Sequence, residues 1–533
     1  MYLDKKIIFY VVATVVFLSS FSGCILNEIF GTSFSLASWS ICDDEGFPGL
    51  SLGFSSSDTV TVKTFGPDGG VIDSELFLQG NNDAVLHLAP YRETVVPGQY
   101  RLKAYDKNNN MIFEETFSFA ASNLSVSSCN QKWWKQYDWM EDYSLIGLTM
   151  MVNNNGVTPV YPHVVEVTVD SETFSGFVLP CSISVGESKY VDCFVYKEDT
   201  PEDSDFIVYL KDSLGNTLAS NSFSIVLDGN VPTEEFKWKY KGHNRVIRIP
   251  YPEFLFDYYS GVDRILNEDY SVYVFDIYDD DYIDLIVDRL MSISNMKSDV
   301  DKINFAASFV QNLEYKSDSE TNDSLEYPRY PVETLFNGEG GGGDCEDLSI
   351  LAAGFLDRMG YDVALFRLPN HMAVGVRLDE NLSNYDYYAD NYYFLETTSV
   401  VPSCGYVPEE SKDPSELSVY PVSSRPLLFH KWKNGTVSIF ENTELGDFVK
   451  ATLFVENLGN ETAKNILVEG GFYTRYGLRP TAETEVISSL KPGMKKKITL
   501  MVDIPPGVTT WFKTKIYLDN NVVDEKETAS SFP

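Results

Sequence analysis

The chain has 533 residues, with 78 acidic and 41 basic side chains, so its formal net charge is −37 at pH 7. This excess of acid argues against nucleic acid as a partner, since phosphate binding needs clustered lysine and arginine. Hydrophobic residues make up 44% of the chain, which indicates globular rather than disordered material. The length exceeds what one hydrophobic core supports and predicts roughly three to five domains.

Residues 1–24 have the layout of an export signal. A basic pair precedes an apolar run from Ile7 to Leu18, and small residues lead up to Cys24. Small residues directly before a cysteine resemble a lipobox, in which Cys24 becomes the lipid-modified first residue of the mature chain. The alternative is an uncleaved membrane anchor, for which the run is short. Both readings predict an exported chain held at the outer face of the cytoplasmic membrane, and its acidity suggests a saline or archaeal setting.

Three regions alternate apolar and polar residues between turn signals, the pattern of β-strands. Regular strand spacing predicts β-sandwiches over 35–122 and 123–228. A third strand-rich region covers 430–533, where VENLGNETAKN and LKPGMKKKITL resemble the immunoglobulin-like adhesion-related repeats of archaeal and bacterial surface proteins. For an exported chain, the candidate disulfides in these regions are Cys181–Cys193 and Cys42–Cys129.

The periodicity changes between residues 229 and 425. Apolar residues recur at helical spacing, first after three aspartates that suit the positive end of a helix. The predicted helices begin at about 279, 303 and 346, the last ending at Gly360, and the predicted strands cover 363–368, 372–376 and 392–395. Helices followed by antiparallel strands predict an α+β domain.

One cysteine has the surroundings of a nucleophile. Cys345 follows four glycines and Asp344 and stands at the start of a predicted amphipathic helix. The positive end of a helix favours a thiolate, and glycines permit a sharp turn that leaves the sulfur open. Asp344 is placed to cap this helix, with Asp347 as its partner three residues on. The alternatives for Cys345 are a disulfide with Cys404 and a zinc site.

Two further residues supply the partners that a nucleophilic thiol needs. His371 lies 26 residues after Cys345, and Glu396 lies 25 residues after His371. A thiol needs a base within hydrogen-bond reach, and the base needs an acceptor that holds its tautomer. The three residues supply these roles in order, with Asp390 as the back-up acceptor.

The remaining parts of the site are less well marked. The backbone N–H of Cys345 is the expected oxyanion donor, and no side-chain donor stands out. Tyr327 and Tyr330 precede the glycines and are expected to line the cleft. Trp133, Trp134 and Trp139 form an aromatic cluster, for which packing is favoured over carbohydrate binding.

Four segments together resemble the transglutaminase-like superfamily, over roughly residues 236–425. They are YPRYPVETL, GGDCEDLSILAAGFLDRMGYDVALFRLP, NHMAVGV and YYFLETTS. The resemblance implies a papain-like core with Cys345 as nucleophile and His371 as base. The third residue of the family is usually Asp, and Glu396 stands there in this chain.

The resemblance also raises the question of calcium. In some exported relatives the acidic residues that flank the cysteine bind calcium. Asp344, Glu346 and Asp347 match that arrangement, and carboxylate oxygens suit this metal. Helix capping explains the same residues without a metal.

These features predict a multidomain chain with an α+β papain-like transglutaminase core at 229–425, flanked by all-β immunoglobulin-like sandwiches. The predicted function is a surface-tethered cysteine enzyme that hydrolyses protein or peptide amide bonds through Cys345, His371 and Glu396. No cofactor is required, and calcium is the candidate metal. The alternatives are a cross-linking transglutaminase with an amine acceptor and a non-catalytic surface-binding or adhesion lipoprotein. The expected partners are a protein or peptide substrate and the membrane, through the lipid anchor.

Overall fold

A computed structural model describes most of the chain after residue 30. The described residues are 31–137, 139–140, 142–198, 205–227, 229–265, 269–321, 326–379, 381–400, 403–412, 414–422, 425–443 and 445–532. The predicted export signal and Cys24 lie outside them. Within the described part, none of the helices is both long and apolar enough to cross a membrane.

The chain divides into two compact units. One contains the residues up to Ser127 with Met151–Tyr161 and Cys181–Lys189, and the other contains Ser128–Met150, Pro162–Pro180 and the residues from Tyr190 onward. Each is described below by its own sheets and helices.

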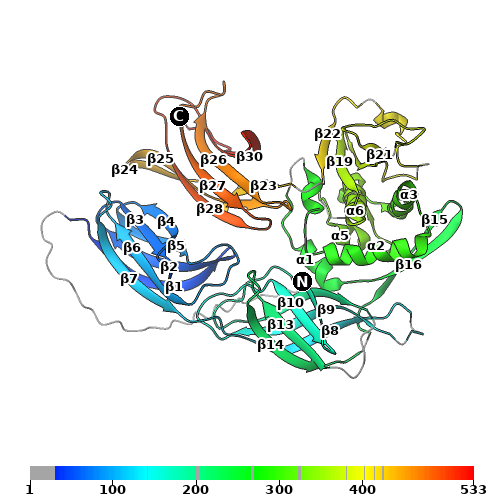
Figure 1. The fold of residues 1–533 in the computed structure, drawn as a ribbon. Helices are drawn as coiled ribbons and strands as arrows, with labels where there is room; N and C mark the ends of the chain where they lie inside the picture. The colour runs from blue at the N-terminus through cyan, green and yellow to red at the C-terminus, as the bar shows by residue number, and fades with distance from the viewer. Residues whose placement is uncertain are drawn as a thin grey trace, which may run out of the picture. The chain divides into compact units, whose positions relative to one another are not determined.

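The first strands form two facing sheets around a common core (Figure 1, blue). Their bounds are β1 (Phe34–Asp44), β2 (Phe47–Ser56), β3 (Val60–Phe65), β4 (Val71–Phe77), β5 (Gly80–His87), β6 (Gly98–Tyr105) and β7 (Met111–Phe119). One sheet has the order β1-β2-β5 and the other β4-β3-β6-β7. Alternate residues such as Val60, Val62, Leu102 and Ala104 are buried between them, as the period of two along a strand requires.

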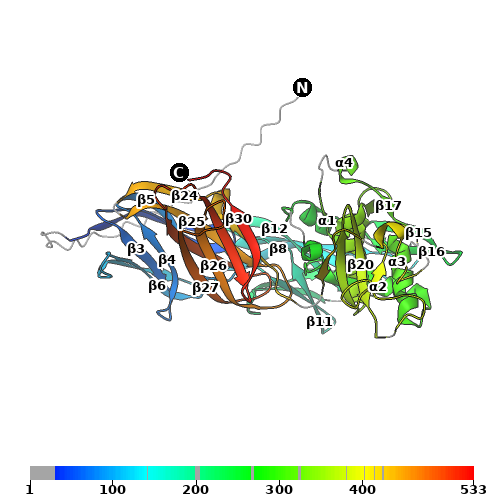
Figure 2. The same ribbon diagram turned by 90° about the horizontal axis from the view of Figure 1, so that it is seen from above.

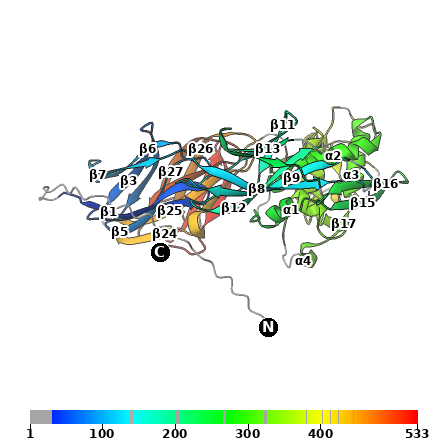
Figure 3. The same ribbon diagram turned by 90° about the horizontal axis from the view of Figure 1, so that it is seen from below.

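The next seven strands form one sheet in the order β14-β13-β10-β11-β12-β9-β8, several of which are labelled in Figure 3. Their bounds are β8 (Leu124–Trp134), β9 (Ser144–Asn154), β10 (Val164–Val169), β11 (Glu172–Val178), β12 (Ser188–Lys197), β13 (Asp205–Lys211) and β14 (Thr217–Ser224). Trp133 and Trp134 are buried at 0% and 1% exposure, so packing accounts for both. Trp139 is exposed and stacks on Tyr137.

The region that carries the candidate site begins with the hairpin β15 (Thr233–Tyr240) and β16 (His243–Pro250). Its helices are α1 (Glu253–Ser260), α2 (Asp280–Ser294), α3 (Asp299–Val310), α4 (Asp318–Thr321), α5 (Pro331–Leu335) and α6 (Cys345–Arg358), with 3-10 turns at Tyr270–Tyr273 and Glu409–Ser411. Its other strands are β17 (Glu314–Tyr315), β18 (Gly342–Gly343), β19 (Asp362–Leu368), β20 (His371–Arg377), β21 (Tyr393–Leu395) and β22 (Ser418–Pro421).

Helix α6 is the centre of this region. It contacts strands β19 and β20 and helices α2, α3 and α5, of which β20, α2 and α3 are labelled in Figure 2. Leu348, Leu351 and Phe355 are buried along it, at the spacing that the sequence predicted. The helix ends where Gly360 adopts a φ of +86° and the N–H of Tyr361 reaches the carbonyl of Leu356 at 3.1 Å, a common glycine-dependent helix end.

The C-terminal strands again form two sheets. Their bounds are β23 (Leu428–Trp432), β24 (Ser438–Thr443), β25 (Gly446–Asn457), β26 (Ala463–Tyr473), β27 (Thr481–Leu490), β28 (Lys495–Asp503), β29 (Trp511–Leu518) and β30 (Asn521–Glu527), with a 3-10 turn at Lys433–Gly435. One sheet has the order β23-β25-β24 with β28 on β25, and the other β27-β26-β29-β30. Buried Asn457, at the end of β25 in the first sheet, links the two sheets. Its Nδ2 donates to the carbonyls of Glu461 at 2.7 Å and of Leu490, on β27 of the second sheet, at 2.9 Å.

The predicted fold class, an α+β papain-like core flanked by sandwiches, is wrong. The structure is mostly β, with 49% strand and 14% helix, and it contains many antiparallel sheets. The predicted helices near 280, 300 and 346 do exist, but helical periodicity over a short region was given too much weight. The strands over 123–228 pair in one continuous seven-stranded order, and the sandwich predicted there stays a prediction.

Candidate active site

His371 and Glu396 lie on neighbouring strands. His371 is the first residue of β20, reached from β19 by a tight turn in which Asn370 has a φ of +58°. Glu396 directly follows β21, which pairs with β20. The imidazole Nε2 of His371 is 3.1 Å from Glu396 Oε2, so the sheet holds these two side chains together.

The Glu396 carboxylate is fixed by more than the histidine. Its Oε1 accepts hydrogen bonds from the N–H groups of Thr397 at 3.0 Å and Thr398 at 2.9 Å, and from the Thr398 hydroxyl at 2.7 Å. Burial acts to raise the pKa of Glu396, but the hydrogen bonds from His371 and Thr398 outweigh it and hold that pKa below its usual range. An ionised Glu396 keeps the proton on His371 Nε2, which leaves Nδ1 to accept another.

Cys345 is the first residue of α6 and is half-buried. The backbone N–H of Met372 hydrogen-bonds its sulfur. Met372 directly follows His371, so this hydrogen bond brings the thiol to the residue beside the imidazole. The thiol also lies 3.2 Å from Glu346 Oε2.

The charge around the sulfur differs from the sequence prediction. Burial raises the pKa of the Cys345 thiol, and the neighbouring carboxyls of Glu346 and Asp344 raise it further. Only the Met372 N–H acts in the other direction. The expected thiolate at the helix N-terminus is therefore opposed by its surroundings, and the resting group is a thiol.

Three free cysteines rule out two of the predicted disulfides. Cys129, Cys345 and Cys404 are free thiols. The pairing of Cys42 with Cys129 is therefore wrong, and so is the alternative in which Cys345 pairs with Cys404. The pairing of Cys181 with Cys193 stays a prediction.

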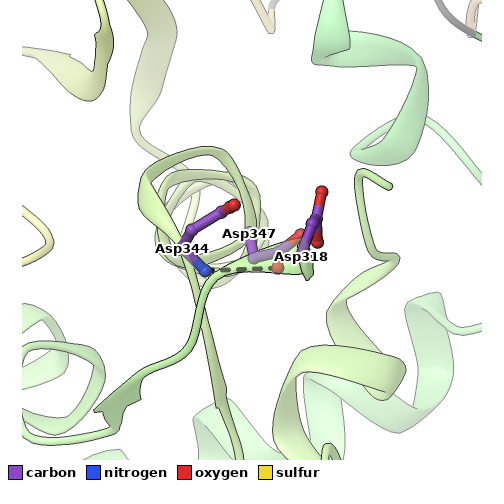
Figure 4. Close-up of side chains that lie close together, drawn as sticks. All are labelled: Asp318, Asp344 and Asp347. Carbon is purple, nitrogen blue, oxygen red and sulfur yellow. Dashed lines mark hydrogen bonds between the residues drawn. The ribbon is translucent and has the colours of Figure 1, made fainter. Parts of the chain in front are cut away.

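A cluster of three aspartates adjoins the start of α6. Ligand oxygens of Asp318, Asp344 and Asp347 all lie within 4.8 Å of one another. Figure 4 shows Asp318 near Asp347, in the first turn of α6, and Asp344, directly before the helix. The guanidinium of Arg329, only 5% exposed, pairs with Asp318 at 2.8 Å and also with Asp347. An arginine of the protein therefore already pairs with two of the three carboxylates.

This arrangement changes which carboxylates could hold calcium. Asp347 Oδ1 accepts the Arg329 N–H at 2.7 Å, and its Oδ2 accepts the Asp344 N–H at 3.3 Å and pairs with the Arg329 guanidinium. Asp344 Oδ1, by contrast, is a buried atom with no hydrogen-bond partner in the described structure. Asp344 therefore keeps an oxygen that a hard cation could bind, whereas Asp347 already pairs with Arg329.

Two expected cleft residues have structural partners instead. Tyr330 is buried, and Tyr327 stacks on the Arg264 guanidinium at 4.1 Å. Arg264 pairs with buried Glu333 at 2.6 Å. Asp390 is exposed in a turn with a φ of +47°, so the acceptor that contacts His371 is Glu396.

Sequence reasoning missed Asp318 and Arg329. A signal was present, because Arg329 is the only basic residue between Lys316 and Arg358. A single arginine in so acidic a segment indicates a buried ion pair, since an unpaired buried charge is costly.

Comparison with known proteins adds little. No protein-family model matches the chain, and no curated protein matches its sequence. Red sea bream transglutaminase is 10% identical, with 74% of this chain and 80% of that chain covered and a TM-score of 0.21. The exo-chitosanase CsxA of Amycolatopsis orientalis is 10% identical, with 90% and 76% covered and a TM-score of 0.15. These scores are too low to carry an argument, so the superfamily resemblance stays a prediction from the sequence.

Proposed function

We propose that the chain is a cysteine enzyme of the transglutaminase-like class that hydrolyses protein or peptide amide bonds. Cys345 is the nucleophile, His371 the base and Glu396 the residue that orients the imidazole. The observation that carries the proposal is the 3.1 Å contact between His371 Nε2 and an ionised, buried Glu396, beside a free thiol at a helix N-terminus.

The first half-reaction forms an acyl-enzyme. His371 Nδ1 takes the proton from Cys345 Sγ while the sulfur attacks the amide carbon, and the carbonyl oxygen becomes an oxyanion. The protonated imidazole then gives its proton to the amide nitrogen, the C–N bond breaks and the amine leaves. A thioester to Cys345 remains.

The second half-reaction releases the acid. His371 Nδ1 accepts a proton from water, the resulting hydroxide attacks the thioester carbon, and the C–S bond breaks. The proton on the imidazole returns to the sulfur. The His371 side chain is 23% exposed, so water reaches the base.

The acidic neighbours of the thiol determine at which step its proton moves to His371. Because Glu346 and Asp344 disfavour the thiolate, a stable thiolate–imidazolium pair does not form in advance. Proton transfer to His371 therefore accompanies attack, and the rate depends strongly on the base.

We also propose that the enzyme works outside the cell, tethered through Cys24. Support comes from the basic, apolar and small-residue segments of residues 1–24. Calcium is not needed for any step above. If bound, it would be held by Asp344 and Glu346 and would neutralise the charge beside the sulfur.

The test is the rate at which iodoacetamide alkylates Cys345 near neutral pH, followed by mass spectrometry. The wild-type thiol is expected to react at least tenfold faster than the same residue in His371→Ala. His243→Ala, at an exposed hairpin position, is the matched control and should behave as wild type. Equal rates in wild type and His371→Ala would overturn the proposed pair.

A further inference from the structure

The short strand β17 brings Tyr315 next to the segment that leads into the nucleophile. Strands β17 and β18 run parallel, with Glu314 opposite Gly342 and Tyr315 opposite Gly343. The N–H of Lys316 donates to the Gly343 carbonyl at 3.0 Å. Tyr315 is thus paired with the residue two positions before Cys345.

The glycines make this close pairing possible. A Cβ on Gly342, which has a φ of +125°, would lie 2.1 Å from the Glu314 carbonyl oxygen. Lys316 holds the same loop from the other side, because its Nζ donates to the carbonyls of Asn337 at 2.6 Å and Gly341 at 2.8 Å. The glycine run therefore serves to place β17 against the start of α6.

The register also fixes the side on which the Tyr315 ring lies. Paired residues of neighbouring strands direct their side chains to the same face of a sheet. A Cβ on Gly343 would meet the Asp347 carboxylate, 2.3 Å away, so the Tyr315 side chain leaves toward the first turn of α6. Burial raises the pKa of Tyr315 to about 12, and the nearby Cys345, Asp344 and Glu346 raise it further.

The Tyr315 hydroxyl is protonated and available. Tyr270, Tyr361 and Tyr392 each donate to a carboxylate. For Tyr315, by contrast, the described residues supply no hydrogen-bond acceptor to the hydroxyl, and the residue is 55% exposed. A substrate at Cys345 can therefore meet a phenol whose donor is unused.

We propose that Tyr315 is the side-chain oxyanion donor of this site. Its Oη–H donates a hydrogen bond to the oxygen that becomes negative when Cys345 Sγ attacks the acyl carbon, while the Cys345 backbone N–H donates the other. No proton is transferred, because the phenol keeps its hydrogen throughout. This assignment rests on the proposed function, which supplies the attack and the oxyanion.

The experiment uses two electrophiles that differ in one respect. Iodoacetamide is attacked at a saturated carbon and forms no oxyanion, whereas p-nitrophenyl acetate is attacked at a carbonyl and forms one. In Tyr315→Phe we expect acetylation of Cys345 to slow about 100-fold, with alkylation of Cys345 within about threefold of wild type. Tyr387→Phe, an exposed tyrosine whose hydroxyl donates to Asn381, should leave both rates unchanged.

The outcomes separate this assignment from the function on which it rests. Unchanged acetylation in Tyr315→Phe, or an equal loss with both electrophiles, overturns the oxyanion role while the proposed enzyme stands. A wild-type protein that p-nitrophenyl acetate does not acetylate at Cys345 overturns both.

Discussion

Two histidines of this chain each contact a carboxylate, but they differ greatly in solvent exposure. His371 contacts Glu396 at 3.1 Å, and its side chain is 23% exposed. His430, on β23, contacts Asp524 at 2.7 Å through Nδ1 and the Thr514 hydroxyl at 2.6 Å through Nε2, but its side chain is 0% exposed. An acid, a histidine and a hydroxyl are thus aligned in the C-terminal sandwich where no substrate can reach them. Access, and not the polar alignment, separates a candidate site from a structural network.

The largest expected effect comes from removing each histidine in turn. His371→Ala should lower the rate of acylation at Cys345 by about 10²–10⁴-fold, because it removes the base, with little change in Tm. His430→Ala should leave that rate unchanged and lower the stability of the sandwich by about 2–3 kcal/mol, because Asp524 and Thr514 lose a buried partner. Acylation kinetics and thermal melts on both variants check this. Slower acylation in His430→Ala would contradict the purely structural role of His430.

A smaller loss is expected from the acceptor. Glu396→Gln should slow acylation by roughly tenfold to a hundredfold, less than removal of the base, because the amide no longer favours the proton on His371 Nε2. Asp390→Asn is the matched control and should have no effect. Steady-state kinetics on an activated ester would show it, and an unchanged rate in Glu396→Gln would count against the orienting role.

Removing a carboxyl next to the Cys345 sulfur is expected to raise the rate of its reaction instead of lowering it. Glu346→Gln removes a carboxyl that raises the pKa of Cys345. Burial raises the pKa of Glu346 itself to about 9, so alkylation of Cys345 should become about three- to tenfold faster above about pH 9 and change little at pH 7. Glu339→Gln, at an exposed position close to the glycines, should not change the rate. A slower reaction in Glu346→Gln would mean that this carboxyl assists the thiol.

Helices α2 and α6 both begin among carboxylates, but only the α6 cluster has a buried arginine. Asp279, before α2, is 3% exposed, and its Oδ2 has no partner among the described residues. Burial, then Asp276 and Asp280, raise the pKa of Asp279 well above 3.8, and burial raises that of Asp280 to about 7.

The sign of the pH effect follows from these shifts. Well below pH 3.8 both folded and unfolded carboxyls are protonated, and as the pH rises to 7 the unfolded state ionises first, so stability falls. Asp279→Asn should therefore be about 1 kcal/mol more stable than wild type at pH 7 and equal to it at about pH 3. Thermal melts across this range test it. Parallel pH profiles for the two proteins would contradict the raised pKa.

The smallest effect is expected from calcium. Arg329 already pairs with Asp318 and Asp347, and the proposed steps use only protein groups, so chelation with EGTA should change the acylation rate less than about twofold. Titration of calcium into the chelated protein checks this. A tenfold recovery that Asp344→Asn abolishes would show that the metal is required.

The sequence predicted the helix and strands around Cys345 and His371 better than it predicted the fold class. The helix from Cys345 follows from apolar spacing and Gly360, and the strand that begins at His371 follows from a run of apolar residues. Periodicity cannot show how much of a long chain is strand, so a short helical region was taken to define the class. Strand runs at regular spacing also do not reveal whether they close into two sheets or one.

The missed parts of the site are those made by distant partners. Arg329 reaches Asp347 across 18 residues, and Tyr315 lies on a two-residue strand that has no periodic signal. The raised pKa of Cys345 depends on burial by the whole region, whereas the helix N-terminus that favours a thiolate is visible locally. Local patterns therefore singled out Cys345 but not its electrostatic environment.

The most direct test of the central claim is competition among the thiols of the folded, reduced protein. A limiting amount of an iodoacetamide probe would be added at neutral pH, and the modified cysteines mapped by mass spectrometry, natively and in denaturant. We predict that Cys345 takes most of the label in the native protein and loses its advantage over Cys129 and Cys404 when unfolded. Native labelling of Cys129 as fast as Cys345 would contradict the claim that Cys345 is an activated nucleophile.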